Sequence, residues 1–336
     1  MTTTMQTQTT MTAVVQDTYG TEPETVFGVE QVPVPTPGKG EVLVRTRAAA
    51  VDRGTWHVMT GYPLLGRMAF GLRTPKVRVP GRDIAGTVEA VGPGVTGFAV
   101  GDEVYGSCGA TRSGSLAEFG LARANRLAPK PTNLTFEQAA AAPISGWTAL
   151  QTVRKAEIQP GQSVAVLGAS GGVGSYVVQM AKAAGAEVTG VASTAKLDLV
   201  RELGADHVVD YTQRDYAEDG PFDVIIDIAG SRTLGELRRA LTPKGRLLIV
   251  GGETDGRLLG GFDRSIRAAL LSPFVGQTLS MVASLEKADD LVVLTEMIEA
   301  GQVTPAVERT YPLADAALAM RHLIDGQARG KLVLVA

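Results

Sequence analysis

The stretch from Val166 to Val178, VLGASGGVGSYVV, places four glycines within seven positions between two apolar runs. A strand, a tight turn and a helix in this order predict the turn that brings a dinucleotide pyrophosphate against the backbone. Gly174 lets the helix pack close to the strand, and the helix N-terminus offers unpaired N–H groups to the phosphates. We therefore predict cofactor contacts from the turn, the alternative being a purely structural glycine turn. The predicted contact residues are Ser170, Gly171, Gly172 and Val173.

From about residue 135 the chain alternates between helical segments and nearly continuous apolar strands. The predicted strands read SVAVLG, EVTGVA, DHVVD, FDVIIDIA, GRLLIVGG and QTLSMV. Unbroken apolar runs are typical of a parallel sheet that is covered on both faces. Right-handed βα units then give a doubly wound sheet of about six strands. We predict a Rossmann domain that binds a dinucleotide over residues 135–302.

The preceding residues, 11–134, carry short apolar strands that Gly and Pro turns separate, a pattern that predicts a mostly antiparallel β domain with barrel-like closure. The last residues, 303–336, predict one helix and a terminal strand, which we expect to return to this first domain. A length of 336 residues also favours two domains. Residues 1–10 are polar and are expected to form a disordered tail.

The charge and composition of the chain limit the classes of binding partner and the cellular location that we expect. The net charge of −3 gives no electrostatic case for nucleic acid or an anionic membrane, and no apolar run approaches spanning length. No basic residue precedes Lys39, which argues against a secretory or mitochondrial leader. Cys108 is the single cysteine, so a disulfide framework is excluded and a cytoplasmic location is expected.

The end of the second predicted strand of the Rossmann domain indicates which dinucleotide binds. NAD-binding domains usually carry an acidic residue there for the ribose 2′-hydroxyl, but EVTGVAS ends at Ser193, followed by Thr194 and Lys196. A hydroxyl and a lysine favour a 2′-phosphate, so we predict NADPH. The alternative is that Ser193 or Thr194 is only a helix cap and that Lys196 is a solvated first-turn residue.

Taken with the glycine turn, several further motifs make the chain resemble the medium-chain dehydrogenase/reductase superfamily, and most closely its zinc-independent quinone oxidoreductase-like branch. The motifs read PGRDIAGTVEAVGPGV, GDEVYG, AAAAPISGWTAL, GADHVVDY and GQARGKLVLV. The resemblance implies a GroES-like catalytic domain built from both chain ends, a nucleotide domain between them, a cleft where nicotinamide meets substrate, and a homodimer.

The resemblance also implies site residues. Thr148 would lie near the nicotinamide, and Ser193, Lys196 and Tyr211 would contact the adenosine phosphate end. The two turns after later strands would line the cofactor cleft, through Ala229, Gly230, Gly251 and Gly252. For Tyr211 the alternative is an aromatic side chain packed under the sheet edge, and for the last two glycines it is a bare turn.

Zinc-dependent members of the superfamily carry an early cysteine and a GHE motif. Here the equivalents are AAAVDRGTWH, which lacks cysteine, and Gly81-Arg82-Asp83. His57, His207 and His322 fall in separate segments without ligand spacing, so we expect no metal site. Without a Lewis acid, hydride transfer is best suited to an acceptor that spreads the resulting charge by conjugation, namely a quinone or an α,β-unsaturated carbonyl.

The catalytic candidates are Asp52 and Tyr62. Members of the family mostly have asparagine where Asp52 stands, and this carboxyl either holds a proton and acts as an acid or pairs with Arg53 or Arg82. Tyr62 resembles a cleft tyrosine of this branch, the alternative being a packed loop aromatic. Four further apolar side chains either shape the pocket or form dimer contacts: Leu64, Leu65, Met68 and Phe70.

These observations predict an NADPH-dependent, zinc-independent reductase of quinones or α,β-unsaturated carbonyls. The first alternative is an NADP-dependent alcohol dehydrogenase or carbonyl reductase without metal. The second is a non-catalytic NADPH-binding protein, because a fold alone does not establish chemistry.

Overall fold

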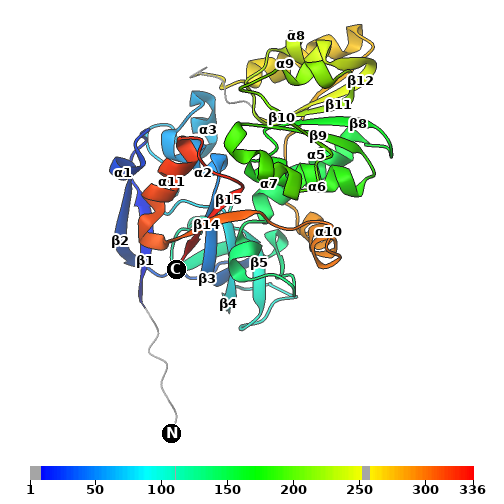
Figure 1. Cartoon of the computed structure of the whole chain (residues 1–336). Helices are drawn as coiled ribbons and strands as arrows, with labels where there is room; N and C mark the ends of the chain where they lie inside the picture. Colours follow the sequence, from blue (N-terminus) through cyan, green and yellow to red (C-terminus); the bar gives the residue numbers. More distant parts are fainter. Residues whose placement is uncertain (1–8, 110, 252–257) are drawn as a thin grey trace.

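The computed structural model of the chain describes residues 9–109, 111–251 and 258–336, which form two lobes (Figure 1). One lobe contains the N-terminal residues together with the C-terminal strand, and the other contains the parallel sheet. The predicted fold class, a Rossmann-type α/β domain beside a GroES-like β domain, is confirmed.

The first lobe contains a two-stranded sheet and a seven-stranded, largely antiparallel sheet. The larger sheet runs in the order β14-β15-β3-β4-β5-β7, and β6 also pairs with β3. This order ends at β14 and β7, so the strand ladders of the described residues do not close a barrel. The strands are β1 (Thr10–Gln16), β2 (Phe27–Pro33), β3 (Glu41–Val51), β4 (Asp83–Val91), β5 (Glu103–Ser107), β6 (Phe119–Arg123), β7 (Leu127–Pro129), β14 (Val307–Pro312) and β15 (Lys331–Val335).

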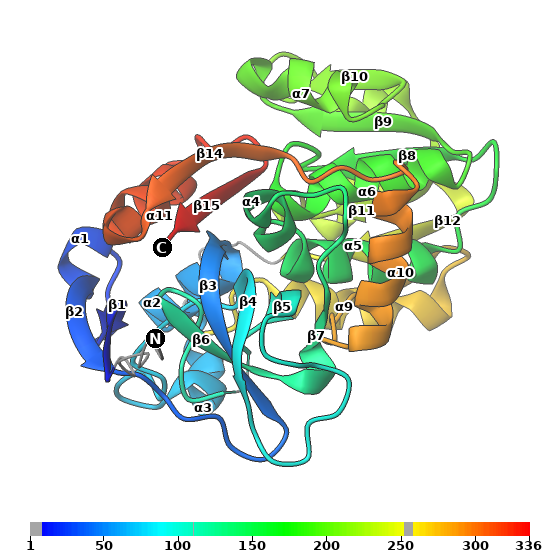
Figure 2. The same ribbon diagram turned by 90° about the horizontal axis from the view of Figure 1, so that it is seen from below.

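The C-terminal strand returns to the first lobe, as predicted. β15 pairs antiparallel with β3, through Leu332 opposite Val51 at one end and Val335 opposite Ala48 at the other. The sequence did not predict β14, which pairs parallel with β15, because its residues alternate little in burial. Figure 2 shows β14 and β15 side by side. The domain limits at 134/135 and 302/303 remain predictions.

The start of the chain differs slightly from the prediction. Thr10 is the first residue of β1 and lies opposite Pro33, so the tail expected over residues 1–10 is shorter than predicted. Residues 1–8 lie outside the described residues.

All six predicted strands of the second lobe form one parallel sheet in the order β10-β9-β8-β11-β12-β13. The chain moves outward from β8 to β10 and then returns to the other side of β8, so the strand order reverses between β8 and β11. Ligands of open α/β sheets bind outside the carboxyl ends of the strands at such a reversal. The strands are β8 (Ser163–Leu167), β9 (Glu187–Ala192), β10 (His207–Asp210), β11 (Phe222–Asp227), β12 (Leu241–Ile249) and β13 (Thr278–Met281).

Helices cover this sheet and connect the lobes. The segment around Pro143 forms two helices, because the proline ring cannot continue the preceding helix and instead starts the next one at its first position. The helices are α1 (Pro23–Val26), α2 (Arg53–Thr60), α3 (Arg67–Phe70), α4 (Phe136–Ala140), α5 (Pro143–Ala156), α6 (Gly172–Ala183), α7 (Leu197–Glu202), α8 (Leu234–Arg239), α9 (Phe262–Leu271), α10 (Ala288–Glu299) and α11 (Ala316–Ile324).

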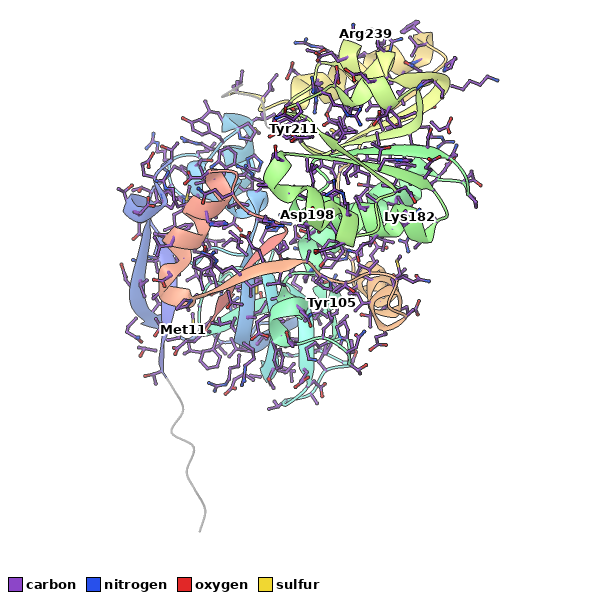
Figure 3. The ribbon with its side chains drawn as sticks, viewed as in Figure 1. Met11, Tyr105, Lys182, Asp198, Tyr211 and Arg239 are labelled. Carbon is purple, nitrogen blue, oxygen red and sulfur yellow. The ribbon has the colours of Figure 1, made fainter. Side chains whose placement is uncertain are left out.

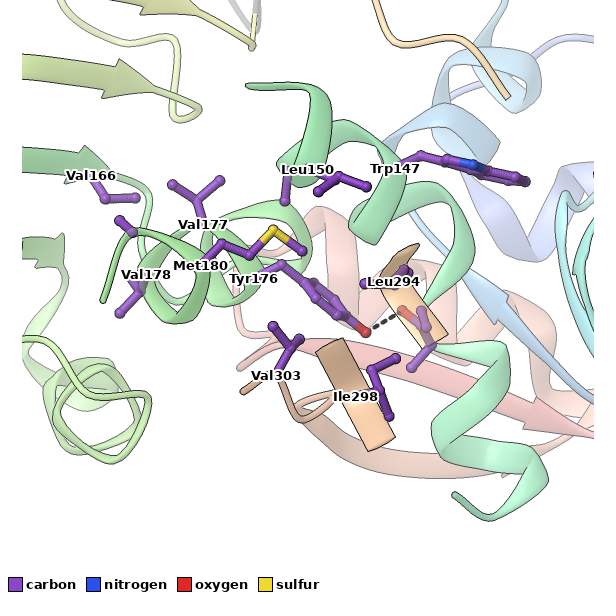
Figure 4. Packing of buried hydrophobic residues seen from close by; sticks show 14 of the residues in the cluster. Trp147, Leu150, Val166, Tyr176, Val177, Val178, Met180, Leu294, Ile298 and Val303 are labelled. Atoms are coloured by element: carbon purple, nitrogen blue, oxygen red, sulfur yellow. Dashed lines mark hydrogen bonds between the residues drawn. The ribbon is translucent and has the colours of Figure 1, made fainter. Parts of the chain in front are cut away.

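The largest buried cluster joins the two lobes rather than filling one of them. Figure 4 shows Tyr176 of α6 and Leu294 of α10 among its members, with the Tyr176 hydroxyl donating to the Ala141 carbonyl at 3.2 Å. Trp147 of α5 belongs to the same cluster and is 1% exposed. Helix α5 therefore packs into the core that the two lobes share. Among the described residues, no helix is both long enough and apolar enough to cross a bilayer.

Candidate active site

A cleft of about 1110 Å³ lies at the carboxyl ends of the parallel strands and is lined by residues of both lobes. Most of the residues predicted for the site meet there. The predicted residues that line it are Asp52, Thr148, Ser170, Gly171, Gly172, Val173, Ser193, Lys196, Tyr211, Ala229 and Gly251. Tyr62 and Gly230 are not among the lining residues, and Gly252 lies outside the described residues.

The glycine turn is tightly packed on the side of the strand and open on the side of the cleft. A Cβ atom on Gly174 would lie 2.1 Å from the Gly168 carbonyl oxygen, so only glycine permits the close packing of helix and strand. A Cβ on Gly171 would meet only that same oxygen, at 3.4 Å, which leaves the rim of the turn open to a ligand. Gly171 is the N-cap residue of α6 and no side chain caps this helix, so its first N–H groups face the cleft.

The loop after β9 presents the Ser193 hydroxyl and the Lys196 ammonium to the cleft. Ser193 is the N-cap residue of the short helix Thr194–Lys196, but its side chain makes no capping hydrogen bond, which argues against the cap alternative. The Lys196 Nζ donates to the carbonyls of Gly326 and Ala328 at 2.6 and 2.7 Å. Lys196 therefore connects the nucleotide lobe to the segment that leads into β15.

Asp210 is the last residue of β10, opposite Ala192 at the end of β9, and Tyr211 follows it. Tyr211, labelled in Figure 3, is 55% exposed, so its ring is not packed under the sheet edge. Both oxygens of the Asp210 carboxylate are occupied: Oδ2 accepts from the Thr194 hydroxyl, and Oδ1 accepts from the backbone and hydroxyl of Thr212. The Asp210 carboxylate is thus held by hydroxyl donors of the two loops that follow β9 and β10.

The turns after β11 and β12 are held by a buried ion pair that sequence reasoning did not identify. The Asp227 carboxylate lies 2.6 Å from Arg264 Nη1, and both side chains are at least nine-tenths buried. Arg264 also donates to the Gly251 carbonyl at 2.9 Å, while the Gly230 N–H donates to Asp227 at 3.0 Å. Gly230 adopts a φ of 74° and serves this turn, whereas its neighbour Ala229 faces the cleft.

Asp52 is ionised and caps α2. Its Oδ1 accepts from the backbone and hydroxyl of Thr55 at 2.8 and 3.0 Å. Burial raises the pKa of Asp52, but the positive charges of Lys331 and Arg82 and the two hydrogen bonds outweigh it and hold the pKa below the ordinary value of an aspartate. A carboxylate with this pKa does not donate a proton at neutral pH, which favours the charge-pairing alternative over the acid role.

Lys331 is the cleft residue that sequence reasoning missed most clearly. Its Nζ donates to Asp83 Oδ2 at 2.8 Å, with the two side chains 2% and 0% exposed. Burial lowers the pKa of Lys331, but Asp83 and Asp52 outweigh it and raise the value. The other oxygen of Asp83 accepts from the Ile144 N–H, at the start of α5. The aliphatic stem of Lys331 lies beside Gly172, where a Cβ would come within 3.1 Å of its Cδ.

The Tyr62 backbone carbonyl lies 2.7 Å from His57 Nδ1, and because a carbonyl only accepts, this nitrogen donates the proton. His57, for which the sequence predicted no metal-ligand role, lines the cleft. Thr148 also lines the cleft, and its hydroxyl donates to the Ile144 carbonyl at 2.8 Å. The Tyr62 and His57 segment thus places the histidine, rather than the tyrosine, on the cleft wall.

The residues at the GHE-equivalent position are engaged with protein partners. Arg82 and Arg126 both pair with Glu286, and Asp83 pairs with Lys331. Burial and the charge of Asp83 raise the pKa of the Cys108 thiol far above its ordinary value. Within the described ranges, no group of three or more His, Cys, Asp or Glu side chains is arranged to hold a metal ion.

Comparison with known proteins shows the family. Residues 38–132 match the alcohol dehydrogenase GroES-like domain, and residues 203–334 match the zinc-binding dehydrogenase family. The chain is 30% identical to the chloroplastic quinone-oxidoreductase QR1 of Triphysaria versicolor, over 96% of this chain and 98% of that one. It is 33% identical to the 2-methylene-furan-3-one reductase of Solanum lycopersicum, over 90% of this chain and 74% of that one.

Comparison with solved structures indicates the same family. The quinone oxidoreductase of Coxiella burnetii superposes with a TM-score of 0.82 at 25% identity, covering 97% of this chain and 99% of that one. An NAD-dependent alcohol dehydrogenase superposes with a TM-score of 0.80 at 32% identity, covering 97% and 100%. The chain belongs to the medium-chain dehydrogenase/reductase superfamily, within which it has quinone oxidoreductases as homologues.

The Asp83–Lys331 pair makes a prediction about stability. Lys331→Met keeps the stem against Gly172 but leaves Asp83 buried and unpaired, so the free energy of unfolding should fall by about 3–5 kcal/mol. The double variant Asp83→Asn/Lys331→Met should recover much of this loss, since the amide still accepts from the Ile144 N–H. Urea denaturation of the single and double variants measures the coupling. Losses that simply add would contradict a direct interaction.

Asp52→Asn gives a second prediction. The amide oxygen of the Asp52→Asn variant would still cap α2. The carboxyl group that is lost carries no proton at neutral pH, because its pKa lies below the ordinary value of an aspartate, so no proton donor is removed. The variant should therefore keep or raise the turnover rate at neutral pH, with little change in unfolding temperature. Steady-state rates across the neutral pH range test this. An Asp52→Asn variant that is folded but inactive would establish an essential chemical role for the carboxyl.

Proposed function

We propose that the chain is an NADPH-dependent, zinc-independent reductase that transfers hydride to quinones or α,β-unsaturated carbonyl compounds. The observation that carries the proposal is the meeting, in one cleft, of the open glycine turn of the nucleotide lobe and a wall of the catalytic lobe. Two homologues support the acceptor class: one is named for quinones, and the other for a methylene-furanone, which is a conjugated ketone.

The residues that would hold the cofactor follow from the cleft. The first N–H groups of α6 would bind the pyrophosphate, with Gly171 leaving room for it. Ala229 and Gly251 would border the path toward Thr148, which places the nicotinamide end against the catalytic lobe. When bound, the reduced cofactor supplies the hydride, and the protein positions it against the acceptor.

The 2′-phosphate of NADPH would lie at the loop after β9. Ser193 supplies an uncapped hydroxyl, Lys196 supplies an ammonium, and Tyr211 supplies a half-exposed ring. The carboxylate of Asp210, which would repel a phosphate, is already hydrogen-bonded by Thr194 and Thr212. These four side chains support NADPH over NADH.

The charges in the catalytic wall support a conjugated acceptor. The Lys331 ammonium is committed to Asp83, and Asp52 is negative, so neither offers a free positive charge to a localised alkoxide. A quinone or enone spreads the added electron pair over its own conjugated system, and water can supply the proton afterwards. The mouth of the cleft contributes the rings of Phe70 and Phe262, which suit a flat apolar acceptor.

The homodimer that the family resemblance implies, and the cytoplasmic location expected from the sequence, are further parts of this proposal. Analytical ultracentrifugation measures the first. A second candidate function, reduction of simple carbonyls or oxidation of alcohols, is favoured by the similarity to the NAD-dependent alcohol dehydrogenase structure.

An acceptor series separates the two activities. Purified protein should oxidise NADPH with a benzoquinone or an enone, and not with the saturated ketone of the same carbon skeleton. EDTA should leave the rate unchanged, and metal analysis should find no stoichiometric zinc. Turnover of the saturated ketone, or a rate abolished by EDTA and restored by zinc, would support the second function. Tight NADPH binding without turnover of any acceptor would indicate a binding protein.

Lys196→Glu tests the cofactor. A charge-assisted hydrogen bond contributes about 1.5–3 kcal/mol, so NADPH affinity should fall on the order of 10-fold or more beyond any change for NADH. Loss of the contacts to Gly326 and Ala328 would affect both cofactors alike. Fluorescence titration gives both dissociation constants, and Lys244→Glu, at an exposed position in β12 that does not line the cleft, is the matched control. Equal losses for the two cofactors would rule out the phosphate role.

A further inference from the structure

The cleft mouth is bordered by a segment whose charge differs from that of the rest of the chain. Between Asp52 and Asp83 there are six basic residues and no acidic one, although the whole chain carries a net charge of −3. The sequence argument against an anionic membrane used the net charge of the whole chain. That value hides the excess of positive charge in residues 53–82. The six are Arg53, Arg67, Arg73, Lys76, Arg78 and Arg82.

Within this segment the residues from Leu64 to Lys76 expose large apolar side chains. Leu64 and Leu65 are 38% and 50% exposed, and Met68 and Leu72 are 71% and 72% exposed. Gly66 and Phe70, which alternate with them in the chain, line the cleft instead. The segment therefore has one side on the cleft and one apolar side toward solvent. We call the latter the mouth patch and define it as Leu64, Leu65, Met68 and Leu72 together with Arg73 and Lys76.

The cations of the mouth patch are available for an external anion. Arg73 and Lys76 are exposed and have no ion pair among the described residues, and Lys76 makes only a hydrogen bond of 3.3 Å to the Met68 carbonyl. By contrast, Arg78 pairs with Asp17 and Glu30, and Arg82 pairs with Glu286. The uncompensated charge of the segment is thus concentrated beside the exposed apolar residues.

Apolar side chains continue across the mouth of the cleft. The Leu65 N–H donates to the Leu258 carbonyl at 3.3 Å, and Leu258 is 64% exposed. Phe262, at the start of α9, is 49% exposed and also lines the cleft. Figure 1 shows α3 and α9 on the same side of the molecule, one on each lobe. An apolar molecule approaching from this side would meet a continuous apolar edge before it reaches the cleft.

We propose that the mouth patch docks the open end of the cleft on an anionic lipid surface. Exposed Leu and Met side chains with adjacent Arg and Lys are the combination that places a segment in the headgroup region, where apolar groups enter the acyl boundary and cations contact acidic lipids. The docked orientation would present the cleft to apolar acceptors dissolved in the bilayer. The docking rests on the surface alone, whereas the supply of acceptor rests on the proposed function.

Vesicle sedimentation tests the docking without any activity. The full chain should sediment with phosphatidylcholine vesicles that contain phosphatidylserine and far less with pure phosphatidylcholine. Each basic residue at an anionic surface contributes about fivefold in partitioning, so Arg73→Gln/Lys76→Gln should reduce binding on the order of 25-fold. Met68→Asp/Leu72→Asp should abolish it. Near-ultraviolet circular dichroism and unfolding temperature confirm that each variant is folded.

Two control variants match these changes. Lys39→Gln/Lys244→Gln removes the same charge at exposed positions away from the cleft, and Val292→Asp changes an exposed apolar residue of α10, which is 48% exposed. Both should sediment like the unmodified chain. Equal loss in the charge control, or no sedimentation with any vesicle, would overturn the proposal. A third outcome would also overturn it: sedimentation that does not change when vesicles are added, together with a dimer that the Met68→Asp/Leu72→Asp variant dissociates. The mouth patch would then be the interface between two copies of the chain.

A kinetic arm separates docking from the proposed function. The two patch variants should reduce a short, water-soluble quinone at the unmodified rate, since none of their residues lines the cleft. They should lose activity only with a long-chain quinone held in phosphatidylserine-containing vesicles. Failure of the unmodified chain with both quinones would refute the proposed function and leave the sedimentation result intact.

Discussion

The buried contact between Lys331 and Asp83 is the interaction on which the relation of the two lobes depends. Asp83 begins β4 in the catalytic sheet, while its carboxylate receives the N–H of Ile144 at the start of α5 and the ammonium of Lys331 at the start of β15. The Lys331 stem then lies under Gly172 of the glycine turn. The Asp83 carboxylate therefore connects β4, the start of α5 and the start of β15, and through the Lys331 stem it also supports the glycine turn. A buried pair of this kind is strongly destabilising to break.

A second buried pair acts at the other end of the cleft. Asp227 and Arg264 hold the loops after β11 and β12, and through them the positions of Ala229 and Gly251. In both pairs the charge is satisfied within the protein. The charged groups of these two pairs are thus engaged with each other rather than with substrate, which is consistent with an acceptor that accommodates its own charge. Specificity would then depend mainly on the shape of the apolar wall.

Much of the fold could be predicted from the sequence, because its signals are local. The six strands of the parallel sheet are continuous apolar runs, and Pro143 marks the division between α4 and α5. The glycine turn was predictable for the same reason. Lys331 was not, since a lysine at the head of an apolar strand looks solvent-exposed until the fold places Asp83 opposite it. Tyr62 was a predicted site residue and His57 was not, whereas His57 is the one that lines the cleft, because which of two neighbouring side chains faces a cleft depends on the path of the loop.

The contacts of residues 326–331 bear on the order in which parts of the fold form. Gly330 forms a parallel bridge with Gly171, its N–H donates to the Ser170 carbonyl at 2.8 Å, and the preceding carbonyls hold Lys196. These partners come after every strand of the parallel sheet in the chain, whereas the glycine turn follows the first of those strands. A nascent chain can therefore form the parallel sheet and still lack the support of its glycine turn. Loss of the contacts that Gly326, Ala328 and Gly330 make would disturb a turn that lies far upstream.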